Sequence, residues 1–261
     1  MSLQNRVALV TGSTSGVGLG IAKSLAEQGA SLILNGFGEP EHIQKILSQF
    51  EAEYRVRTFY SEADLAKPDA IAKMVQDAFE IFGRIDILVN NAGIQHVEKI
   101  DEFPTERWDA ILAVNLSAVF HSIKLCLPRM RQQQWGRIIN ISSTHGLVAS
   151  ANKSAYVAAK HGVIGLTKAV ALETALSKIT CNAICPGWVL TPLVEKQIEA
   201  LANSENINSK EASLRLLSEK QPSQEFVTAE QIGAAVLYLC SEAAAQVRGT
   251  ALNIDGGWLA Q

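Results

Sequence analysis

The chain has 261 residues, of which 48% are hydrophobic and 19% are charged, and its formal net charge at pH 7 is −3. This length suits one large α/β domain or two small ones and is enough to bury a sizeable core. The slightly negative charge and the dispersed lysines and arginines exclude the basic surface that is typical of nucleic-acid-binding proteins.

The start of the chain and its cysteines indicate a compartment. A strand-like segment begins at residue 6, which leaves no room for a signal peptide, and no uninterrupted apolar stretch reaches the length of a membrane span. The cysteines show neither a disulfide framework nor metal-ligand spacing and are expected in the core: Cys126, Cys181, Cys185 and Cys240. We therefore expect a reduced, cytoplasmic protein without membrane contact and without a bound metal.

The first half of the chain alternates strand-like and helix-like segments. Apolar runs and helical apolar spacing predict, in order, a strand at 7–10, a helix at 16–28, a strand at 31–34, a helix at 41–53, a strand at 56–60, a helix at 68–82 and a strand at 85–89. The uninterrupted run at 85–89 is typical of a strand that is buried on both faces of a parallel sheet. The alternation therefore predicts right-handed βαβ units.

The second half continues the alternation with longer helices. We expect helices at 105–115 and 116–133, a strand at 138–141, a helix that carries Tyr156 and runs to about residue 177, a strand at 180–184, a helix at 228–240 and a strand at 251–254. The more polar residues 190–222 predict a mobile helical flap. Residues 1–261 should form one Rossmann-fold domain, a doubly wound parallel sheet of about seven strands with helices on both faces.

A glycine-rich turn follows the first strand and opens the first helix. It contains Gly12, Thr14, Ser15, Gly16, Val17 and Gly18. Glycines let backbone amides approach a phosphate closely, and the amino end of a helix favours negative charge. At this strand-to-helix junction the turn predicts a dinucleotide site, although its Gly-x3-Gly-x-Gly spacing differs from the commoner dinucleotide motif.

A second motif suggests proton transfer. Tyr156 and Lys160 are four residues apart, so their side chains share one face of a helix. A nearby ammonium lowers a tyrosine pKa from its usual value of about 10 and makes a base that works near neutral pH. Ser143 lies just past the buried strand at 138–141. For the Tyr–Lys pair alone, a solvated helix with no chemical role is the alternative.

Together these motifs resemble the short-chain dehydrogenase/reductase family. Ser143, Tyr156 and Lys160 match its catalytic set, and Asn115 matches a helix asparagine that supports a water-linked proton path. The resemblance covers the whole chain. It implies that Tyr156 is the general acid and base, that Ser143 orients the substrate oxygen, and that Lys160 lowers the Tyr156 pKa and holds the nicotinamide ribose. It also implies a homotetramer.

The resemblance further implies where a nicotinamide cofactor would bind. Beyond the glycine-rich turn, the matching positions are Asp64, Leu65, Asn91, Gly93, Val114, Tyr156, Lys160, Pro186, Gly187, Val189 and Thr191. Asn35-Gly36-Phe37-Gly38 ends the second strand, where NAD-binding folds often carry an acid for the ribose 2′-hydroxyl. No basic residue stands nearby to bind a 2′-phosphate, Phe37 could fill the space of such a phosphate, and Glu39 would repel it. We therefore expect NAD rather than NADP.

Polar and aromatic residues beside the catalytic set predict a small anionic substrate. Lys153 is three residues before Tyr156 and would place a second ammonium on the same helix face, although a solvated lysine is the competing interpretation. The expected substrate contacts are Gln95, Ser143, His145, Lys153, Tyr156, Trp188, Gln197 and Trp258.

The segments that carry these residues resemble family members that oxidise (R)-3-hydroxybutyrate to acetoacetate with NAD. They are residues 93–97, 142–146, 186–194, 221–223 and 256–258. The resemblance implies this hydroxy acid and its keto acid as the substrates. Two alternatives stay open: an NADPH-dependent reductase of 3-oxoacyl-carrier-protein or acetoacetyl-CoA, and a non-catalytic nucleotide-binding protein on the same fold.

Overall fold

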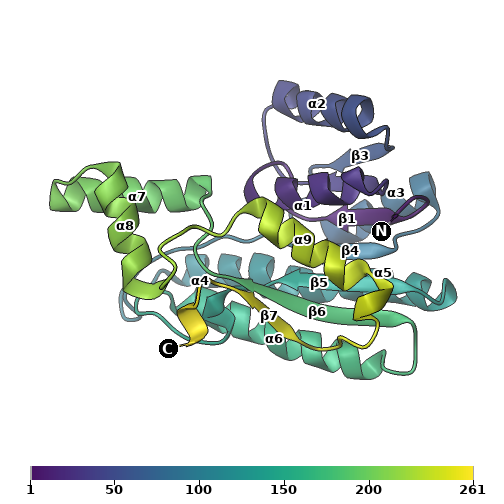
Figure 1. Cartoon of the computed structure of the whole chain (residues 1–261). Helices are drawn as coiled ribbons and strands as arrows, with labels where there is room; N and C mark the ends of the chain where they lie inside the picture. The colour runs from purple at the N-terminus through teal and green to yellow at the C-terminus, as the bar shows by residue number, and fades with distance from the viewer. Residues whose placement is uncertain (1, 261) are drawn as a thin grey trace.

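A seven-stranded parallel sheet lies between two layers of helices in the computed structural model, which describes residues 2–260 apart from the side chains of residues 192 and 193 (Figure 1). The strand order is β3-β2-β1-β4-β5-β6-β7, so the order reverses between β1 and β4. At such a switch point the carboxyl ends of parallel strands leave a crevice for ligands. The strands are β1 (Val7–Val10), β2 (Ser31–Asn35), β3 (Thr58–Ser61), β4 (Ile87–Asn90), β5 (Gly136–Ile141), β6 (Ile179–Pro186) and β7 (Ala251–Ile254).

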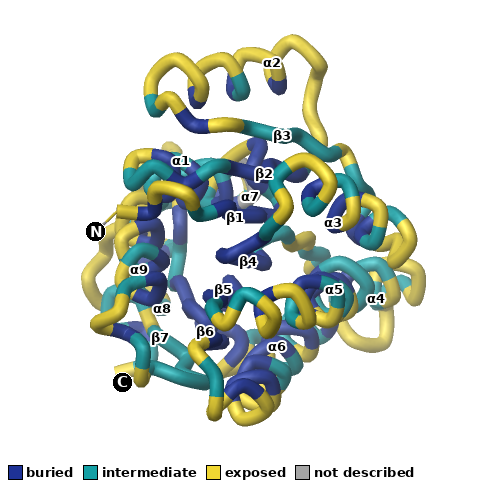
Figure 2. The backbone as a smooth tube through the Cα atoms, turned by 90° about the vertical axis from the view of Figure 1, so that its right-hand side faces the viewer, coloured by how far each residue is buried: buried dark blue, intermediate teal, exposed yellow. Residues whose placement is uncertain are grey.

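The two helical layers cover opposite faces of the sheet because successive strand side chains point to opposite sides. Ala8 and Val10 of β1 pack with the layer of α1, α2 and α9, and Val7 and Leu9 pack with the layer of α3, α5 and α6. Figure 2 shows the buried strands between these layers. The helices are α1 (Gly16–Glu27), α2 (Pro40–Gln49), α3 (Pro68–Phe82), α4 (Thr105–Leu112), α5 (Ala118–Gln132), α6 (Ser154–Glu173) and α9 (Ala229–Cys240).

The doubly wound fold expected from the sequence is confirmed, and the differences lie at element ends. β5 begins at Gly136 because its first residue already pairs with Ile179 of β6. Two helices end in π-helical turns, η1 (Phe50–Tyr54) after α2 and η2 (Ala113–Ser117) between α4 and α5. The helix that carries Tyr156 ends at Glu173, before residue 177. Arg248 holds the following turn by donating to the carbonyl oxygens of Thr174, Ser177 and Ile179.

One finding differs from the sequence-based expectation about membranes. The helical stretch Thr105–Gln132, which comprises α4, η2 and α5, is long and apolar enough to cross a membrane by length and composition. Polar residues such as Asn115 interrupt its apolar run, and for this reason it was not recognised in the sequence. The stretch packs against β4, β5, α3 and α6 and buries Asn115, as the core helix of a globular domain does. A single stretch of this kind, 39% of it buried, is weak evidence for a membrane span.

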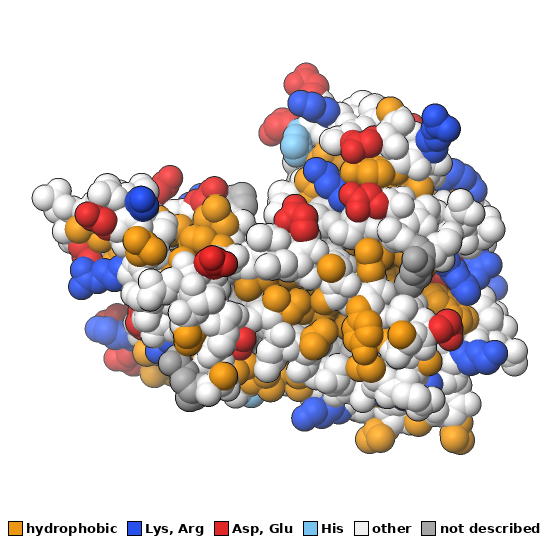
Figure 3. All heavy atoms as spheres, in the orientation of Figure 1, with side chains coloured by type: hydrophobic (Ala, Val, Ile, Leu, Met, Phe, Trp, Pro, Cys, Tyr) orange, Lys and Arg blue, Asp and Glu red, His pale blue; other side chains and the backbone are white. Residues whose placement is uncertain are grey.

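The segment expected to form a helical flap folds into two helices, α7 (Pro192–Glu205) and α8 (Ser209–Lys220), that pack against each other. They stand away from the sheet (Figure 1) and have a small apolar cluster of their own, formed by Val194, Ile198, Ala202 and Ala212. On the face seen in Figure 3, the surface is hollowed between these helices and the part of the protein that carries α1 and α2. The flap thus lies beside the carboxyl edge of the sheet.

Asp86 anchors the amino edge of the sheet, opposite the switch-point crevice. Its buried carboxylate accepts hydrogen bonds from the Arg6 guanidinium at 2.8 Å and the Val7 N–H at 2.9 Å, and it also pairs with Arg84. We expect Asp86→Ala to lower the free energy of unfolding by about 2–3 kcal/mol, because hydrogen bonds between charged groups are lost and the backbone N–H is left unpaired. Urea denaturation measures this change.

The matched control is Asp77→Ala, which removes a carboxylate that pairs with Lys73 on the surface of α3. Exposed ion pairs of this kind contribute little to stability, so this variant should remain close to the wild type. Equal losses in the two variants would contradict the assigned role of Asp86.

Candidate active site

A cavity of about 550 Å³ opens at the carboxyl ends of the central strands. It is lined by all the sequence-predicted site residues except Asn115: Gly12, Thr14, Ser15, Gly16, Val17, Gly18, Phe37, Asp64, Leu65, Asn91, Gly93, Gln95, Val114, Ser143, His145, Lys153, Tyr156, Lys160, Pro186, Gly187, Trp188, Val189, Thr191, Gln197 and Trp258. Its volume is within the usual range for small-molecule sites. The fold thus gathers residues from many separate segments of the sequence, from Gly12 to Trp258, into one site.

The glycine-rich turn between β1 and α1 forms one end of the cavity. Gly12 has a positive φ of 62°, and a Cβ there would lie 2.9 Å from Ala92 Cα. A Cβ on Gly18 would lie 2.2 Å from the Gly12 carbonyl oxygen. Both positions therefore require glycine, and the bare backbone at the start of α1 fits a phosphate group.

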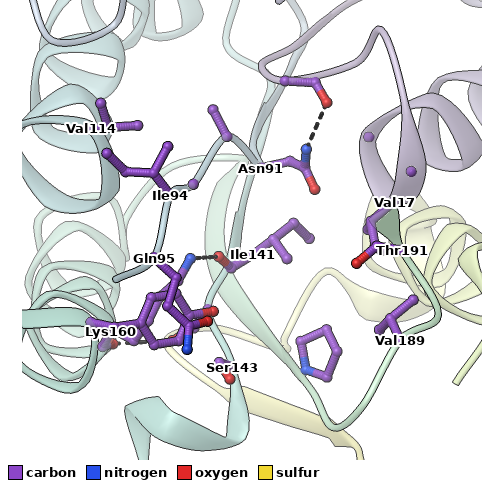
Figure 4. A pocket seen from close by; sticks show the side chains of 18 of the residues that line it. Val17, Asn91, Ile94, Gln95, Val114, Ile141, Ser143, Lys160, Val189 and Thr191 are labelled. Atoms are coloured by element: carbon purple, nitrogen blue, oxygen red, sulfur yellow. Dashed lines mark hydrogen bonds between the residues drawn. The ribbon is translucent and has the colours of Figure 1, made fainter. Parts of the chain in front are cut away.

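Asn91 fixes this turn to the end of β4. Its side-chain Nδ2 donates to Gly12 O at 3.1 Å (Figure 4) and to Thr11 O at 2.9 Å. Thr11 Oγ1 accepts from the backbone N–H of Asn91 at 2.9 Å. The polar side chain therefore holds the turn to the sheet, and its contribution to the site is structural in this arrangement.

At the end of β2, where NAD-binding folds often carry an acid for the ribose 2′-hydroxyl, Asn35 has a structural role. Asn35 is buried, donates to Ser61 O at 3.1 Å and Ala63 O at 3.0 Å, and accepts from Gly12 N at 3.4 Å. Its side chain is occupied by bonds between loops and does not replace a ribose-binding acid. Phe37 is 69% exposed and lines the cavity, and its carbonyl oxygen accepts a hydrogen bond from Thr14 Oγ1 at 2.9 Å.

Asn115 lies behind the cavity wall. It is buried in the π-helical turn η2, where Nδ2 donates to Ile94 O and Oδ1 accepts from Ile94 N, both at 2.9 Å. A Cβ on Gly93 would lie 3.5 Å from Asn115 Oδ1 and 3.7 Å from Lys160 Nζ. Asn115 therefore supports the strand-end segment that faces Lys160.

Lys160, Tyr156 and Ser143 meet where α6 crosses the end of β5. Lys160 Nζ donates to Ile141 O at 2.8 Å and lies 5.5 Å from the centroid of the Tyr156 ring (Figure 4). Burial lowers the pKa of Lys160 to about 8. Burial also raises the pKa of Tyr156, and the hydrogen bond with Ser143 opposes this change.

Burial therefore opposes the lowering of the Tyr156 pKa that the sequence predicts from Lys160, whose ammonium is directed to the Ile141 carbonyl oxygen. Lys160 is buried, whereas Tyr156 is half-buried and lines the cavity. Removal from water favours the neutral forms of both side chains.

The other end of the cavity combines aromatic walls with hydrogen-bond donors. The His145 ring packs edge-on to Trp258 and Tyr156, with centroid distances of 5.4 and 6.0 Å, and its Nε2 lies 2.9 Å from Ser150 Oγ. Lys153 caps the start of α6, with Nζ 5.0 Å from the Trp188 ring centroid. Burial lowers the pKa of Lys153.

Two donors at this end are buried without a hydrogen-bond partner among the described residues, namely Gln95 Nε2 and Trp188 Nε1. In Figure 4 the Gln95 side chain reaches toward Lys160 and Ser143. Buried donors without acceptors are costly, so an arrangement of this kind is typical of a site that receives an oxygen-rich ligand.

Several residues of this site carry no recognisable motif in the sequence. Ile94, Ile141 and Val194 line the cavity with apolar surface, and Ser142 Oγ donates to Lys160 O at 3.1 Å. The sequence indicates these residues only by their position next to the motifs described above. Ser150 had no signal, because its contact with His145 depends on the path of the loop between them.

Residues 6–202 match the short chain dehydrogenase family. The chain belongs to this family and is an oxidoreductase. D-beta-hydroxybutyrate dehydrogenase of Cupriavidus necator is 58% identical over 99% of this chain and 100% of its own length. The enzyme of the same name from Rhizobium meliloti is 52% identical, over 98% and 99%.

Solved structures of short-chain dehydrogenases agree with this assignment. L-sorbose reductase from Gluconobacter frateurii, in complex with NADPH and L-sorbose, superposes with a TM-score of 0.95 at 29% identity, over 100% of this chain and 99% of that chain. Family membership establishes a nicotinamide-dependent oxidoreductase, and the choice between NAD and NADP depends on the residues that face the adenosine.

His145 makes the stability of the protein depend on pH. Burial, followed by the charges of Lys153, Lys220 and His161, lowers the His145 pKa from its ordinary 6.5 to about 4. As the pH falls below about 6.5, an unfolded chain binds a proton at this histidine and the folded chain does not, so the free energy of unfolding decreases until about pH 4. We expect His145→Gln to lose less stability than the wild type between about pH 7.5 and about pH 5.

Urea denaturation at these two pH values measures the difference. His42→Gln, on the exposed surface of α2, is the matched control and should behave as the wild type does. If His145→Gln loses as much stability as His42→Gln, the histidine is not held in its neutral form.

Proposed function

We propose that this protein oxidises (R)-3-hydroxybutyrate to acetoacetate with NAD, which releases NADH and a proton. The observation that carries the proposal is the substrate end of the cavity, where Lys153 and the unpartnered donors of Gln95 and Trp188 surround the Ser143–Tyr156–Lys160 set. This end accepts a short anion with an oxygen at the reacting carbon. The two dehydrogenase relatives that share more than half of their residues with this chain support the same substrate.

Each catalytic side chain has one task in this reaction. Tyr156 removes the hydroxyl proton of the substrate as the carbon–oxygen double bond forms, and it returns that proton in the reverse direction. Ser143 donates a hydrogen bond that orients the substrate oxygen and favours the tyrosinate. Lys160 keeps a positive charge beside the tyrosine ring. When bound, nicotinamide supplies the hydride acceptor and, in its oxidised form, a positive charge that further favours the tyrosinate.

The residues of the cavity fit such a cofactor. Gly12, Gly16 and Gly18 leave the backbone at the start of α1 free of side chains, as a pyrophosphate requires. Asp64 and Leu65 would flank the adenine, and Thr191, the N-cap of α7, would face the nicotinamide carboxamide. Asn115 would support a water-linked path for the proton from Lys160.

Selectivity for NAD follows from the end of β2. Thr14 Oγ1 is bonded to Phe37 O, and a Cβ on Gly36 would lie 2.5 Å from the same Thr14 oxygen, so the segment is tightly packed. It presents the exposed Phe37 ring to the cavity, and Glu39 is exposed two residues further along the chain. Among the lining residues, no arginine or lysine lies at this end of the cavity. A 2′-phosphate would meet an apolar ring and a carboxylate. L-sorbose reductase, by contrast, was solved with NADPH.

A spectrophotometric panel tests the function directly. The wild type should reduce NAD with (R)-3-hydroxybutyrate far faster than with the S enantiomer, and NADP should support at most a few per cent of that catalytic efficiency. Tyr156→Phe should keep the fold and lose about three to four decades of turnover, in the range expected for a general acid–base group. Faster reduction of acetoacetyl-CoA by NADPH would instead identify a thioester reductase.

Lys153 should determine the preference for an acid. A charge-assisted hydrogen bond contributes about 1.5–3 kcal/mol, so Lys153→Ala should raise the Michaelis constant for 3-hydroxybutyrate by about one to two decades. The same variant should affect a neutral secondary alcohol much less. Lys45→Ala, at an exposed position on α2, is the control and should change neither value. An equal loss with acid and alcohol would rule out carboxylate binding by Lys153.

The expected setting of this reaction is a cytoplasmic homotetramer in which residues 1–261 form one domain and the α7–α8 flap moves over the substrate. Exposed apolar side chains on three helices support assembly: Phe120 on α5, Leu172 on α6 and Tyr238 on α9. Light scattering in solution measures the mass of the assembly.

A further inference from the structure

Gln221 is a fully buried polar side chain at the point where the flap rejoins the rest of the protein. It follows the last residue of α8, and its Oε1 accepts a hydrogen bond from the backbone N–H of Trp188 at 2.9 Å. Its Nε2 donates to the carbonyl oxygen of Glu225. One side chain thus joins the segment that enters the flap to the segment that leaves it.

The surroundings of Gln221 are shaped to hold it. A Cβ on Gly187 would lie 2.4 Å from Gln221 Oε1, and a Cβ on Gly256 would lie 2.7 Å from Gln221 Cγ. Ser223 N also donates to Gly256 O at 3.0 Å. Three segments, which follow β6, α8 and β7, therefore converge on this amide. The segments after β6 and β7 contact it at a glycine, Gly187 and Gly256.

Two of these segments carry the aromatic walls of the substrate end. Trp188 directly follows Gly187, and Trp258 is two residues past Gly256. The two indole rings lie with centroids 6.0 Å apart, and Trp258 in turn packs against His145. A further link at the base of the flap comes from Val227 N, which donates to Trp188 O at 2.8 Å. Gln221 itself does not line the cavity.

We propose that Gln221 is a positioning residue that fixes Trp188 and the base of the α7–α8 flap, and thereby sets the fit of the pocket to a short hydroxy acid. The inference deepens the proposed function and rests on it for the identity of the substrate. Gln221 touches no substrate. It acts through the Trp188 backbone, whose N–H it binds, and through the loop at 222–227, which it ties down at Glu225.

The test compares Gln221→Leu and Gln221→Glu with Gln44→Leu, a control on the exposed surface of α2. In Gln221→Leu the Michaelis constant for (R)-3-hydroxybutyrate should rise about tenfold, the change that corresponds to the loss of one buried hydrogen bond. Turnover and the affinity for NADH should change less than about threefold, because the glycine-rich turn is untouched. Gln221→Glu keeps an acceptor for the Trp188 N–H and should show a smaller rise.

Hydrogen exchange gives a readout that does not depend on turnover. The Trp188 amide should exchange at least about tenfold faster in Gln221→Leu than in the wild type, because its acceptor is gone, and it should stay protected in Gln221→Glu. Asp86→Ala, destabilised at the opposite edge of the sheet, controls for a general loss of stability and should leave the exchange of this amide and the Michaelis constant near their wild-type values.

Three results would overturn the proposal: an unchanged Michaelis constant, a Trp188 amide that stays protected in Gln221→Leu, or an equal loss of NADH affinity. If Gln221→Leu does not fold, Gln221→Glu tests the proposal instead. A glutamate cannot donate to the Glu225 carbonyl oxygen, so the amides of residues 222–227 should exchange faster than in the wild type, and unchanged exchange there would overturn the proposal. A wild type that does not oxidise 3-hydroxybutyrate would refute the proposed function and leave the exchange result valid for the positioning role.

Discussion

The active site depends on one buried ammonium. Lys160 Nζ donates to Ile141 O, and this bond joins α6 to the carboxyl end of β5. A buried charge is tolerated only where hydrogen bonds replace water, so the helix and the strand must keep their relative positions for the lysine to remain there. Ser142 Oγ strengthens the same junction by donating to Lys160 O. Because Tyr156 lies on the same helix and Ser143 follows the same strand, this junction also fixes the relative positions of these two side chains.

The electrostatics of the cavity follow from burial at this junction. Removal from water raises the pKa of Tyr156 and lowers that of Lys160 to about 8, so near pH 7 the phenol is neutral and the lysine keeps its charge. The tyrosinate therefore needs further positive charge, which an oxidised nicotinamide would bring. At the substrate end His145 stays neutral near pH 7, and Lys153 is the cationic side chain among the lining residues there. This division of charge suits the binding of one carboxylate beside one ionisable phenol.

The two ends of the cavity are built by different means. At the phosphate end, bare backbone forms the wall, because there is no space for a Cβ at Gly12 or Gly18. Asn91 holds this turn to the sheet by hydrogen bonds. At the substrate end, packed aromatic rings and a flap supply the walls. These walls come from segments that are linked at Gln221, away from the sheet. The first end is held directly to the sheet, whereas the second is held by contacts at the base of α7 and α8.

Much of the site could be inferred from short-range patterns. The glycine-rich turn, the four-residue spacing of Tyr156 and Lys160, and the strand before Ser143 each describe a local structure whose form is fixed by neighbouring residues. The alternation of apolar strands with amphipathic helices likewise determined the doubly wound sheet. Periodicity did not locate the ends of β5 and β6, because pairing between strands decides where a strand stops.

Local patterns in the chain were enough to infer the family, the fold and most of the residues that line the cavity. How those residues contact one another is visible only in the folded protein: Asn35 turns inward to hold two loops, Asn115 lies behind the wall, burial raises the Tyr156 pKa, and Gln221 joins both ends of the flap. The physical reason is that burial and hydrogen-bond partners come from segments far apart in the chain, and no local pattern records them.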